Sequence, residues 1–280
     1  MADNKAKPKI TVENQTNPVT QEVKQKVKFP TEIIDLPSKG WFYPSDSPFA
    51  GGQVELRYMT AKEEDILTSQ NLVKKGVVID RLLTSLLEEP YKSAYNDLLI
   101  GDKNAIMIAA RVLGYGKEYK VEINDGAGNK QEETIDLTSL DDKEIDFDNY
   151  EKGSSNFDLE LPASKRHITF TLLTQGKELQ IENELKGLKK MTKRTGIDVE
   201  MTTRLKHLIT SIDGDEESAS IRNFVDNEML SLDSRALREA VQAVNPDVDM
   251  SVLFTSQESG EEMIVDIPIT TEFFWPRAGK

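Results

Sequence analysis

The chain has 280 residues, of which 30% are charged and 38% are hydrophobic, and its formal net charge is -14. A negative field of this size repels phosphate backbones, so we expect no broad face that binds nucleic acid. Cysteine is absent, which excludes disulfides, thiolate metal ligands and cysteine nucleophiles. No apolar run approaches the ~20 residues of a membrane span, and residues 1–30 lack the apolar core of a signal peptide. We therefore expect a protein that is made in a cytosol and is kept or assembled there.

The amino-terminal segment, residues 1–29, has the opposite charge from the rest of the chain. It contains six lysines against three acids and few large apolar side chains. This composition predicts a disordered arm. Two interpretations stay open, because a basic arm can be a solvated tail or can become ordered on an acidic neighbour.

Residues 30–140 are predicted to form a first α+β half. Alternating apolar residues over 54–58 indicate a strand, and the capping-box pattern from Thr60 to Glu63 predicts a helix that starts at Ala61. A second helix is expected over 77–87, because its leucines share one face. A third helix should start after Asp102 and stop at the glycines of 114–116. A β-hairpin over 119–137 then closes this half.

An acidic stretch follows the first half. Residues 131–160 hold eleven acids and two lysines, and we predict that 141–156 form a solvated linker. A calcium-binding loop would need oxygen ligands in a fixed register with a turn glycine and a closing glutamate. The residues from Asp146 to Asn149 lack that register, so we favour the linker.

Residues 157–280 are predicted to form a second α+β half with the same order of elements. A strand around 168–172 ends at Thr174, where a helix follows. A further helix is expected to place Met201, Leu205, Leu208 and Ile212 on one face. The last helix begins after Asp233, and a final hairpin runs over 252–269.

The two halves can be aligned. Val54–Thr60 aligns with Ile168–Thr174, and Asp102–Leu137 aligns with Asp233–Pro268 without a gap. We therefore predict an α+β fold of two related halves, each built from a strand, helices and a β-hairpin. Identity is low, and a chance recurrence of the same element order is the alternative.

Motifs for catalysis are missing from this sequence. His167 and His207 are interpreted as surface groups, and neither is placed for a serine triad or a histidine-based zinc site. The Gly116-Lys117 pair is followed by Glu118, which does not fit a phosphate-binding loop. With 49 acids in the chain, pairs of carboxylates carry no information. We expect no catalytic, cofactor-binding or metal-binding residue and no enzymatic activity.

Two aromatic clusters lie outside the periodic elements, and aromatic anchors carry much of the energy at protein interfaces. One cluster stands in a proline-bounded loop and the other near the carboxyl terminus. Alternatively, both clusters fold back as caps on the core of the chain. The candidate partner-binding residues are Leu36, Pro37, Trp41, Phe42, Tyr43, Pro44, Phe273, Phe274, Trp275 and Pro276.

Three segments resemble a known family. The run from Leu36 to Pro44 (LPSKGWFYP) resembles the "LPSKG-x-x-YP" opening of a family of baseplate proteins from T-even-like contractile-tailed phages. Residues 101–116, with their Gly-Asp, Ala-Ala-Arg and Gly-Tyr-Gly groups, resemble the "GD … AxR … xYG" segment of that family. Residues 273–276 resemble its terminal "FFWP". The three segments occur in the family's order and span most of residues 36–276.

Members of this family are described as baseplate hub subunits or hub assembly factors. The resemblance implies a structural or assembly protein of the tail baseplate hub, located in the virion and assembled in the host cytoplasm. Its partners would be other hub or tail proteins, or further copies of itself. A transient assembly chaperone that leaves before the virion matures is one alternative. A hub-associated cell-wall hydrolase is another, and it would require a cleft with a buried carboxylate that holds a proton.

One departure from the family concerns metal. Relatives often carry Cys-x-x-Cys pairs at the tips of the two hairpins, which suggests a zinc knuckle. Here the tips, residues 124–129 and 255–260, contain no cysteine. We therefore predict no zinc, and we expect strand pairing and apolar faces to hold the hairpins together.

Overall fold

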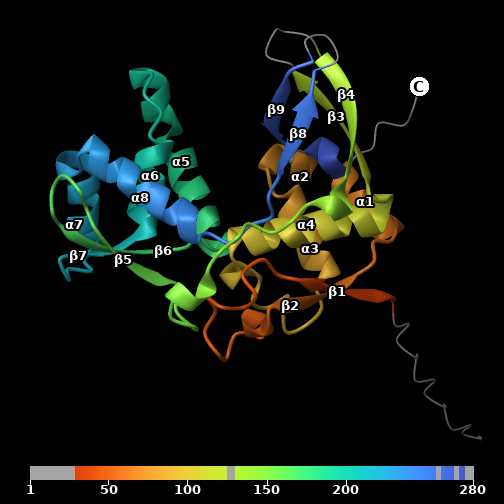
Figure 1. The fold of residues 1–280 in the computed structure, drawn as a ribbon, viewed down its shortest axis with the longest axis horizontal. Helices are drawn as coiled ribbons and strands as arrows, with labels where there is room; N and C mark the ends of the chain where they lie inside the picture. Colours follow the sequence, from red (N-terminus) through yellow and green to blue (C-terminus); the bar gives the residue numbers. More distant parts are fainter. Residues whose placement is uncertain (1–28, 125–129, 257–259, 268–270, 275–280) are drawn as a thin grey trace, which may run out of the picture.

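The computed structural model describes residues 29–124, 130–256, 260–267 and 271–274. Figure 1 shows these residues in two lobes. The first lobe contains helices α1–α4 and strands β1–β4, together with β8 and β9 from the end of the chain. The second lobe contains α5–α8 and β5–β7. The mixture of helices with small antiparallel sheets confirms the predicted α+β class.

The first lobe begins with an antiparallel strand pair that leads into helices. The capping box at Thr60 forms as predicted, and the helix α1 starts at Ala61. A short helix, α2, was not predicted. The elements of this lobe are β1 (Thr31–Asp35), β2 (Gln53–Arg57), α1 (Ala61–Thr68), α2 (Gln70–Lys75), α3 (Val78–Leu86), α4 (Ile100–Tyr115), β3 (Glu118–Asn124) and β4 (Lys130–Asp136).

The second lobe combines a three-stranded antiparallel sheet, in the order β5-β6-β7, with four helices. Its elements are β5 (Asn156–Glu160), β6 (His167–Thr171), α5 (Gln175–Thr195), α6 (Glu200–Leu208), β7 (Ile209–Ile212), α7 (Ser218–Asn223) and α8 (Ser231–Val244).

One predicted helix is too long. The helix α6 ends at Leu208, and the next four residues form β7, in which Ile212 pairs with Ile168 of β6. The spacing of Met201, Leu205, Leu208 and Ile212 fits a helix, but the β-branched residues at the end of this segment complete the sheet instead. The prediction that Ile212 lies on this helix is therefore wrong, and Met201 is 52% exposed.

The last hairpin consists of β8 (Ser251–Thr255) and β9 (Glu262–Asp266), and it lies in the first lobe above α4 (Figure 1). The chain crosses over after α8. The Pro246 carbonyl oxygen lies 1.7 Å from the position that a Cβ on Gly101 would occupy, so only glycine fits there. Asn104 of α4 also donates a hydrogen bond to Asp247 at 3.0 Å. The second half of the sequence therefore contributes to both lobes.

The acidic stretch is more closely packed than a solvated linker. Asp142 forms a bridge with Val248 of the crossover, and the aromatic rings of Phe147 and Tyr150 pack against Phe42. Most of the acidic side chains of residues 141–151 do point outward. The aromatic residues of this stretch close the core while its acids face solvent, and the prediction that 141–156 form a linker between two halves stays a prediction.

The two halves show one shared local arrangement. Asp102 and Asp233 are the third residues of α4 and α8, and both are fully buried. Asp102 accepts a hydrogen bond from the backbone of Ser38 at 2.9 Å, and Asp233 accepts one from the backbone of Ala163 at 2.7 Å. A Leu-Pro pair precedes each of these donors. The proposed relation between the two complete halves stays a prediction.

Glu63 of the capping box forms a buried ion pair. Its carboxylate lies 2.7 Å from the Arg57 guanidinium, and the side chains are 1% and 11% exposed. Thr60 donates to the same carboxylate through its backbone and hydroxyl groups, at 2.9 and 2.6 Å. Burial by itself raises the pKa of Glu63, but the hydrogen bonds from Arg57 and Thr60 outweigh it and hold the pKa at about 2.

We expect Glu63→Gln to destabilise the protein by about 2–4 kcal/mol, because the substitution leaves the Arg57 charge without its partner in a mostly buried site. Urea denaturation followed by circular dichroism measures this change. The matched control is Glu64→Gln, since Glu64 is the exposed neighbour in the same helical turn. Equal stability of the two variants would show that the ion pair is dispensable.

Candidate functional site

The three segments that carry the family resemblance converge on α4. Leu36–Pro44 lies at the amino-terminal end of this helix, and the 3-10 turn Thr271–Phe274 contacts its carboxyl-terminal half. The helix itself supplies Asp102 and Arg111, one for each end. We call these two residues and their hydrogen-bond partners the α4 network.

Asp102 holds the amino-terminal end of the α4 network. Its carboxylate accepts hydrogen bonds from the Ser38 backbone at 2.9 Å, the Ser38 hydroxyl at 2.7 Å and the Tyr43 hydroxyl at 2.6 Å. The Tyr43 oxygen in turn accepts a bond from the Leu99 backbone at 2.8 Å. All four residues are buried, so these contacts fix the loop on the helix.

Burial also changes the acid–base properties of this cluster. Burial raises the pKa of Asp102 to about 6, although hydrogen bonds from Tyr43 and Ser38 oppose this increase. Burial, followed by the charge of Asp102, raises the pKa of the Tyr43 phenol well above its usual value. Asp102 therefore holds its proton more tightly than a solvated carboxyl group does. It is buried in the protein interior, where a substrate cannot reach it.

Arg111 holds the carboxyl-terminal end of the α4 network. Its guanidinium donates to the carbonyl oxygens of Phe273 at 2.8 Å, Gly116 at 2.6 Å and Glu118 at 2.9 Å. The ring of Phe273 packs edge-on against Tyr119 at a centroid distance of 5.0 Å. One side chain therefore joins the helix, the start of the β3–β4 hairpin and the end of the described chain.

The aromatic loop forms a cluster with the acidic stretch. The ring of Phe42 lies 5.7, 5.8 and 5.4 Å from those of Phe147, Tyr150 and Phe157, respectively. Trp41 lies at the edge of this cluster, and its indole nitrogen donates to the Tyr150 carbonyl at 3.0 Å. Phe147 and Tyr150 come from the segment that the sequence indicated as a linker, and Phe157 comes from β5.

Most of the predicted partner-binding residues are interior residues of this chain. This burial agrees with the alternative interpretation, in which the aromatic clusters fold back onto the core of the chain. The buried residues are Leu36, Pro37, Phe42, Tyr43, Phe273 and Phe274. Trp41 is half-buried and Pro44 is exposed, so both can be reached by a partner. Trp275 and Pro276 lie outside the described residues.

Sequence reasoning missed the polar residues of the α4 network. Ser38 and Asp102 were noted only as letters of a motif or as the start of a helix. A signal was available, because Asp102 aligns with Asp233, and an aspartate at the same place in two helices indicates a specific hydrogen-bonding role.

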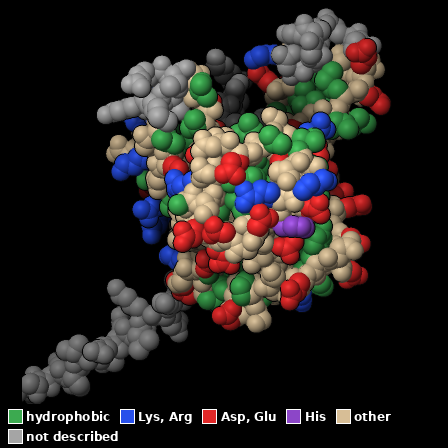
Figure 2. Space-filling model, turned by 90° about the vertical axis from the view of Figure 1, so that its left-hand side faces the viewer, with side chains coloured by type: hydrophobic (Ala, Val, Ile, Leu, Met, Phe, Trp, Pro, Cys, Tyr) green, Lys and Arg blue, Asp and Glu red, His purple; other side chains and the backbone are tan. Residues whose placement is uncertain are grey.

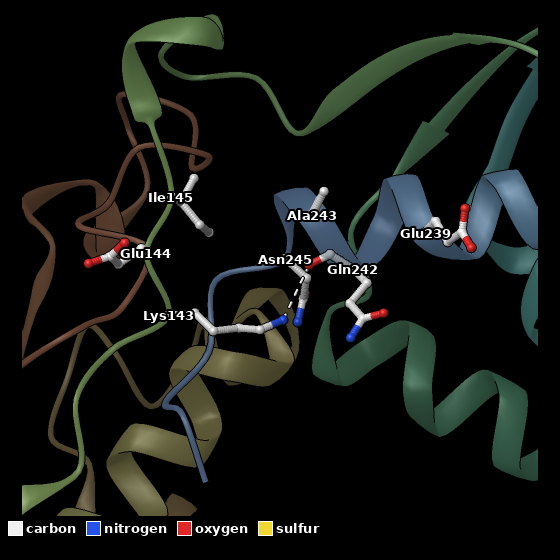
Figure 3. A pocket seen from close by; sticks show the side chains of 7 residues that line it. All are labelled: Lys143, Glu144, Ile145, Glu239, Gln242, Ala243 and Asn245. Atoms are coloured by element: carbon white, nitrogen blue, oxygen red, sulfur yellow. Dashed lines mark hydrogen bonds between the residues drawn. The ribbon is translucent and has the colours of Figure 1, made fainter. Parts of the chain in front are cut away.

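The surface contains an open cleft of about 370 Å³ between the acidic stretch and the carboxyl-terminal end of α8 (Figure 3). Lys143 closes part of it by donating to the Gln242 carbonyl at 3.2 Å. The carboxylates of Glu144 and Glu239 are exposed and point in different directions from separate walls. A hydrolase would need a proton-holding carboxyl group here, and Asp102 is buried elsewhere. The lining residues are Lys143, Glu144, Ile145, Glu239, Gln242, Ala243 and Asn245.

Figure 2 shows acidic and basic side chains interspersed on the end of the second lobe. Within the described ranges, no group of three or more histidine and carboxylate side chains is arranged to hold a metal ion. None of the helices in the described part of the chain is long and apolar enough to cross a membrane.

The geometry therefore defines an α+β protein in which the motif residues build a closed interior network. A family model described as T4 bacteriophage base plate protein matches residues 30–275, and the chain belongs to this family. The resemblance drawn from the three sequence segments is thereby confirmed at the level of the baseplate. Membership implies a location in the virion tail and interaction with other tail proteins. No curated protein and no solved structure matches the chain.

Proposed function

We propose that this baseplate protein is a subunit of the baseplate hub that acts by binding other hub or tail proteins, without catalysing a reaction. The observation that carries this proposal is the presence of exposed aliphatic pairs on both lobes. Leu253 and Ile264 are 67% and 74% exposed, and Leu230 and Leu232 are 51% and 57% exposed. Exposed apolar side chains that lie side by side, as Leu253 and Ile264 do across β8 and β9, are typical of protein-binding sites.

Trp41 supplies a second type of contact. Its ring is half-buried, and the ammonium group of Lys152 lies 5.2 Å from the ring centre. A large aromatic side chain with a polar rim is the usual composition of an interface hot spot. Together with the exposed Pro44, Trp41 forms a small site at which a partner can dock.

A transient assembly chaperone is the second candidate. The net charge of -14 favours it, because such a charge keeps an unassembled protein soluble at high concentration. A chaperone would be made in the host cytoplasm, bind a hub protein there and leave. The two candidates differ in whether the mature particle contains the chain.

Mass spectrometry of purified, salt-washed virions distinguishes them. Peptides from this chain in stoichiometric amounts would support a permanent hub subunit. Absence from virions, together with abundance in infected-cell lysate in a complex with a hub protein, would overturn the subunit proposal and favour the chaperone.

We expect Trp41→Ala to reduce the amount of this protein in assembled baseplates by roughly tenfold, because it removes the aromatic anchor. Complementation of a phage that lacks the gene, followed by quantitative mass spectrometry of particles, measures the effect. Trp41→Phe is the matched control, since it keeps an aromatic ring and removes the indole hydrogen bond to Tyr150. Normal incorporation of a folded Trp41→Ala variant into baseplates would exclude Trp41 as an anchor for a partner protein.

A further inference from the structure

The hairpin β8–β9 and its preceding crossover carry only negative charge. The described residues 245–256 and 260–266 contain five acids and no lysine or arginine, and we call them the acidic hairpin. On its outward face Leu253 lies directly opposite Ile264, and both are mostly exposed. The intervening residues Val252, Phe254, Met263 and Val265 pack against the core. Leu253 and Ile264 therefore form an exposed aliphatic pair within a hairpin whose charged residues are all acidic.

The other hairpin of the first lobe provides an internal comparison. In the alignment of the two halves Leu253 corresponds to Glu122, and Glu122 lies opposite Glu132 on β3–β4. These two glutamates are ion-paired, Glu122 with Lys130 at 3.1 Å and Glu132 with Lys120 at 3.2 Å. At this pair the outward face of β3–β4 is thus internally neutralised, whereas the outward face of the acidic hairpin presents the apolar side chains of Leu253 and Ile264.

A surface of complementary chemistry occurs on the second lobe. The last part of α5, residues 186–194, contains five lysine and arginine residues and no acid. Figure 1 shows this end of α5 extending beyond α6 and α8. Ile197 and Met201 follow it and are 65% and 52% exposed. We call residues 186–201 the basic tip, although Asp198 and Glu200 lie at its base.

We propose that the acidic hairpin of one copy binds the basic tip of a second copy, head to tail. The opposite charges attract, and the two exposed aliphatic pairs can bury each other. Contact between two acidic hairpins is disfavoured, because it would bring two sets of five carboxylates together. The same reasoning disfavours contact between two basic tips.

A head-to-tail contact uses different surfaces on the two copies. Every added copy therefore presents one unused hairpin or tip, and the series ends only when a ring closes. A closed ring is an assembly that a hub subunit can form, and in this respect the inference rests on the proposed function. Self-association is measured on the purified chain, whereas hub membership is measured in virions, so either can fail separately.

Analytical ultracentrifugation of the full chain at low salt tests the proposal. We expect wild-type protein to associate with increasing concentration and to dissociate when salt is added. The double variants Glu262→Lys/Asp266→Lys and Lys186→Glu/Lys193→Glu should each weaken self-association by roughly tenfold or more. An equimolar mixture of the two should associate again, because each reversed surface finds a complementary one.

The cross-strand pair Glu122 and Glu132 of the other hairpin, β3–β4, supplies the matched control. Glu122→Lys/Glu132→Lys changes the net charge by the same amount as the hairpin reversal, and it should leave association unchanged. Wild-type protein that stays monomeric at low salt up to about 0.1 mM would overturn the proposal. Association that persists in both double variants would also overturn it.

Zero-length carboxyl–amine crosslinking of unmodified protein gives a second readout that does not depend on the folding of variants. A mixture of isotopically light and heavy chains distinguishes crosslinks between copies from those within a copy. We expect mixed-isotope crosslinks that join Glu262 or Asp266 to Lys186 or Lys193. Crosslinks from the acidic hairpin to lysines of residues 1–28 instead would identify the arm as its occupant and would contradict the assignment to the basic tip.

Discussion

Asp102→Ala is expected to destabilise the folded chain by about 4 kcal/mol. The substitution leaves the Ser38 backbone, the Ser38 hydroxyl and the Tyr43 hydroxyl without their acceptor. Each buried donor left unsatisfied costs about 1–3 kcal/mol, and the loop cannot move into water without exposing Phe42 and Tyr43. Chemical denaturation monitored by circular dichroism, together with tryptophan fluorescence, measures the change.

The control for this substitution is Asp148→Ala. Asp148 is an exposed acid on the turn that contributes Phe147 to the aromatic cluster, so its removal should change stability by no more than about 0.5 kcal/mol. If Asp102→Ala were as stable as this control, the α4 network would not be what holds the amino-terminal loop in place.

The pH dependence gives an independent test at the same residue. The pKa of Asp102 is about 6 in the folded chain and near 3.8 without the fold, so folding favours the protonated form. Its stabilising contribution is fully present below about pH 3.8 and is lost as the pH rises through 6. Asp102→Asn cannot titrate. The stability of wild type relative to this variant should therefore increase by about 2 kcal/mol from about pH 7.5 to about pH 4.5.

A constant difference between wild type and Asp102→Asn over this pH range would show that burial does not raise the pKa of Asp102. Comparing the two proteins at each pH is essential, because other groups titrate in the same range. The pKa of Glu63, held at about 2, contributes in the opposite direction, since its stabilisation is lost as the pH falls below 4.5.

Local signals in the sequence predicted the local elements well. The capping box at Thr60 located the start of α1, and alternation of apolar residues located β2 and both hairpins. These signals succeed because the interactions involved lie within a few residues of one another. The start of α4 was less accurate, since Asp102 lies inside its first turn and binds a loop 64 residues away.

The failures come from contacts between distant segments. The residues of 201–212 fit one helical face, but pairing with β6 makes the last four a strand. The burial of Phe42 could not be predicted either, because two of its partners, Phe147 and Tyr150, belong to a stretch interpreted as a linker for its acidity. Trp41 and Tyr150, for example, are 109 residues apart. The acidic composition of that stretch reflects the side chains that face solvent. It gives no information about the aromatic side chains that face the core.

The assignment of aromatic anchors has the same physical limit. A run of aromatic residues beside prolines is compatible with an interface and with a core, since both bury apolar area. The fold resolves this for Phe42, Tyr43, Phe273 and Phe274, which are buried within the chain. The exposed aliphatic pair of β8–β9 went unnoticed, because alternation alone does not distinguish the inward face of a hairpin from the outward one.

Arg111→Met is expected to destabilise the protein by about 3 kcal/mol and to loosen both hairpins. Methionine can fill much of the same volume, but it leaves the carbonyl oxygens of Phe273, Gly116 and Glu118 without their donors. Because one guanidinium joins the helix to both the β3–β4 hairpin and the turn after β9, the loss should spread to both. Hydrogen–deuterium exchange should therefore increase by roughly tenfold over residues 118–123 and 262–266.

Arg238→Met on α8 is the matched control for this substitution. Arg238 is exposed and donates to the Ser234 carbonyl one turn earlier, so its replacement should change stability by less than about 0.5 kcal/mol. Arg111→Lys separates charge from geometry, because an ammonium group retains the charge but cannot reach three diverging carbonyls as a planar guanidinium does. We expect Arg111→Lys to lose most of the stability that Arg111→Met loses. A lysine variant as stable as wild type would show that a buried positive charge alone, and not the three directed hydrogen bonds, holds the end of the chain on α4.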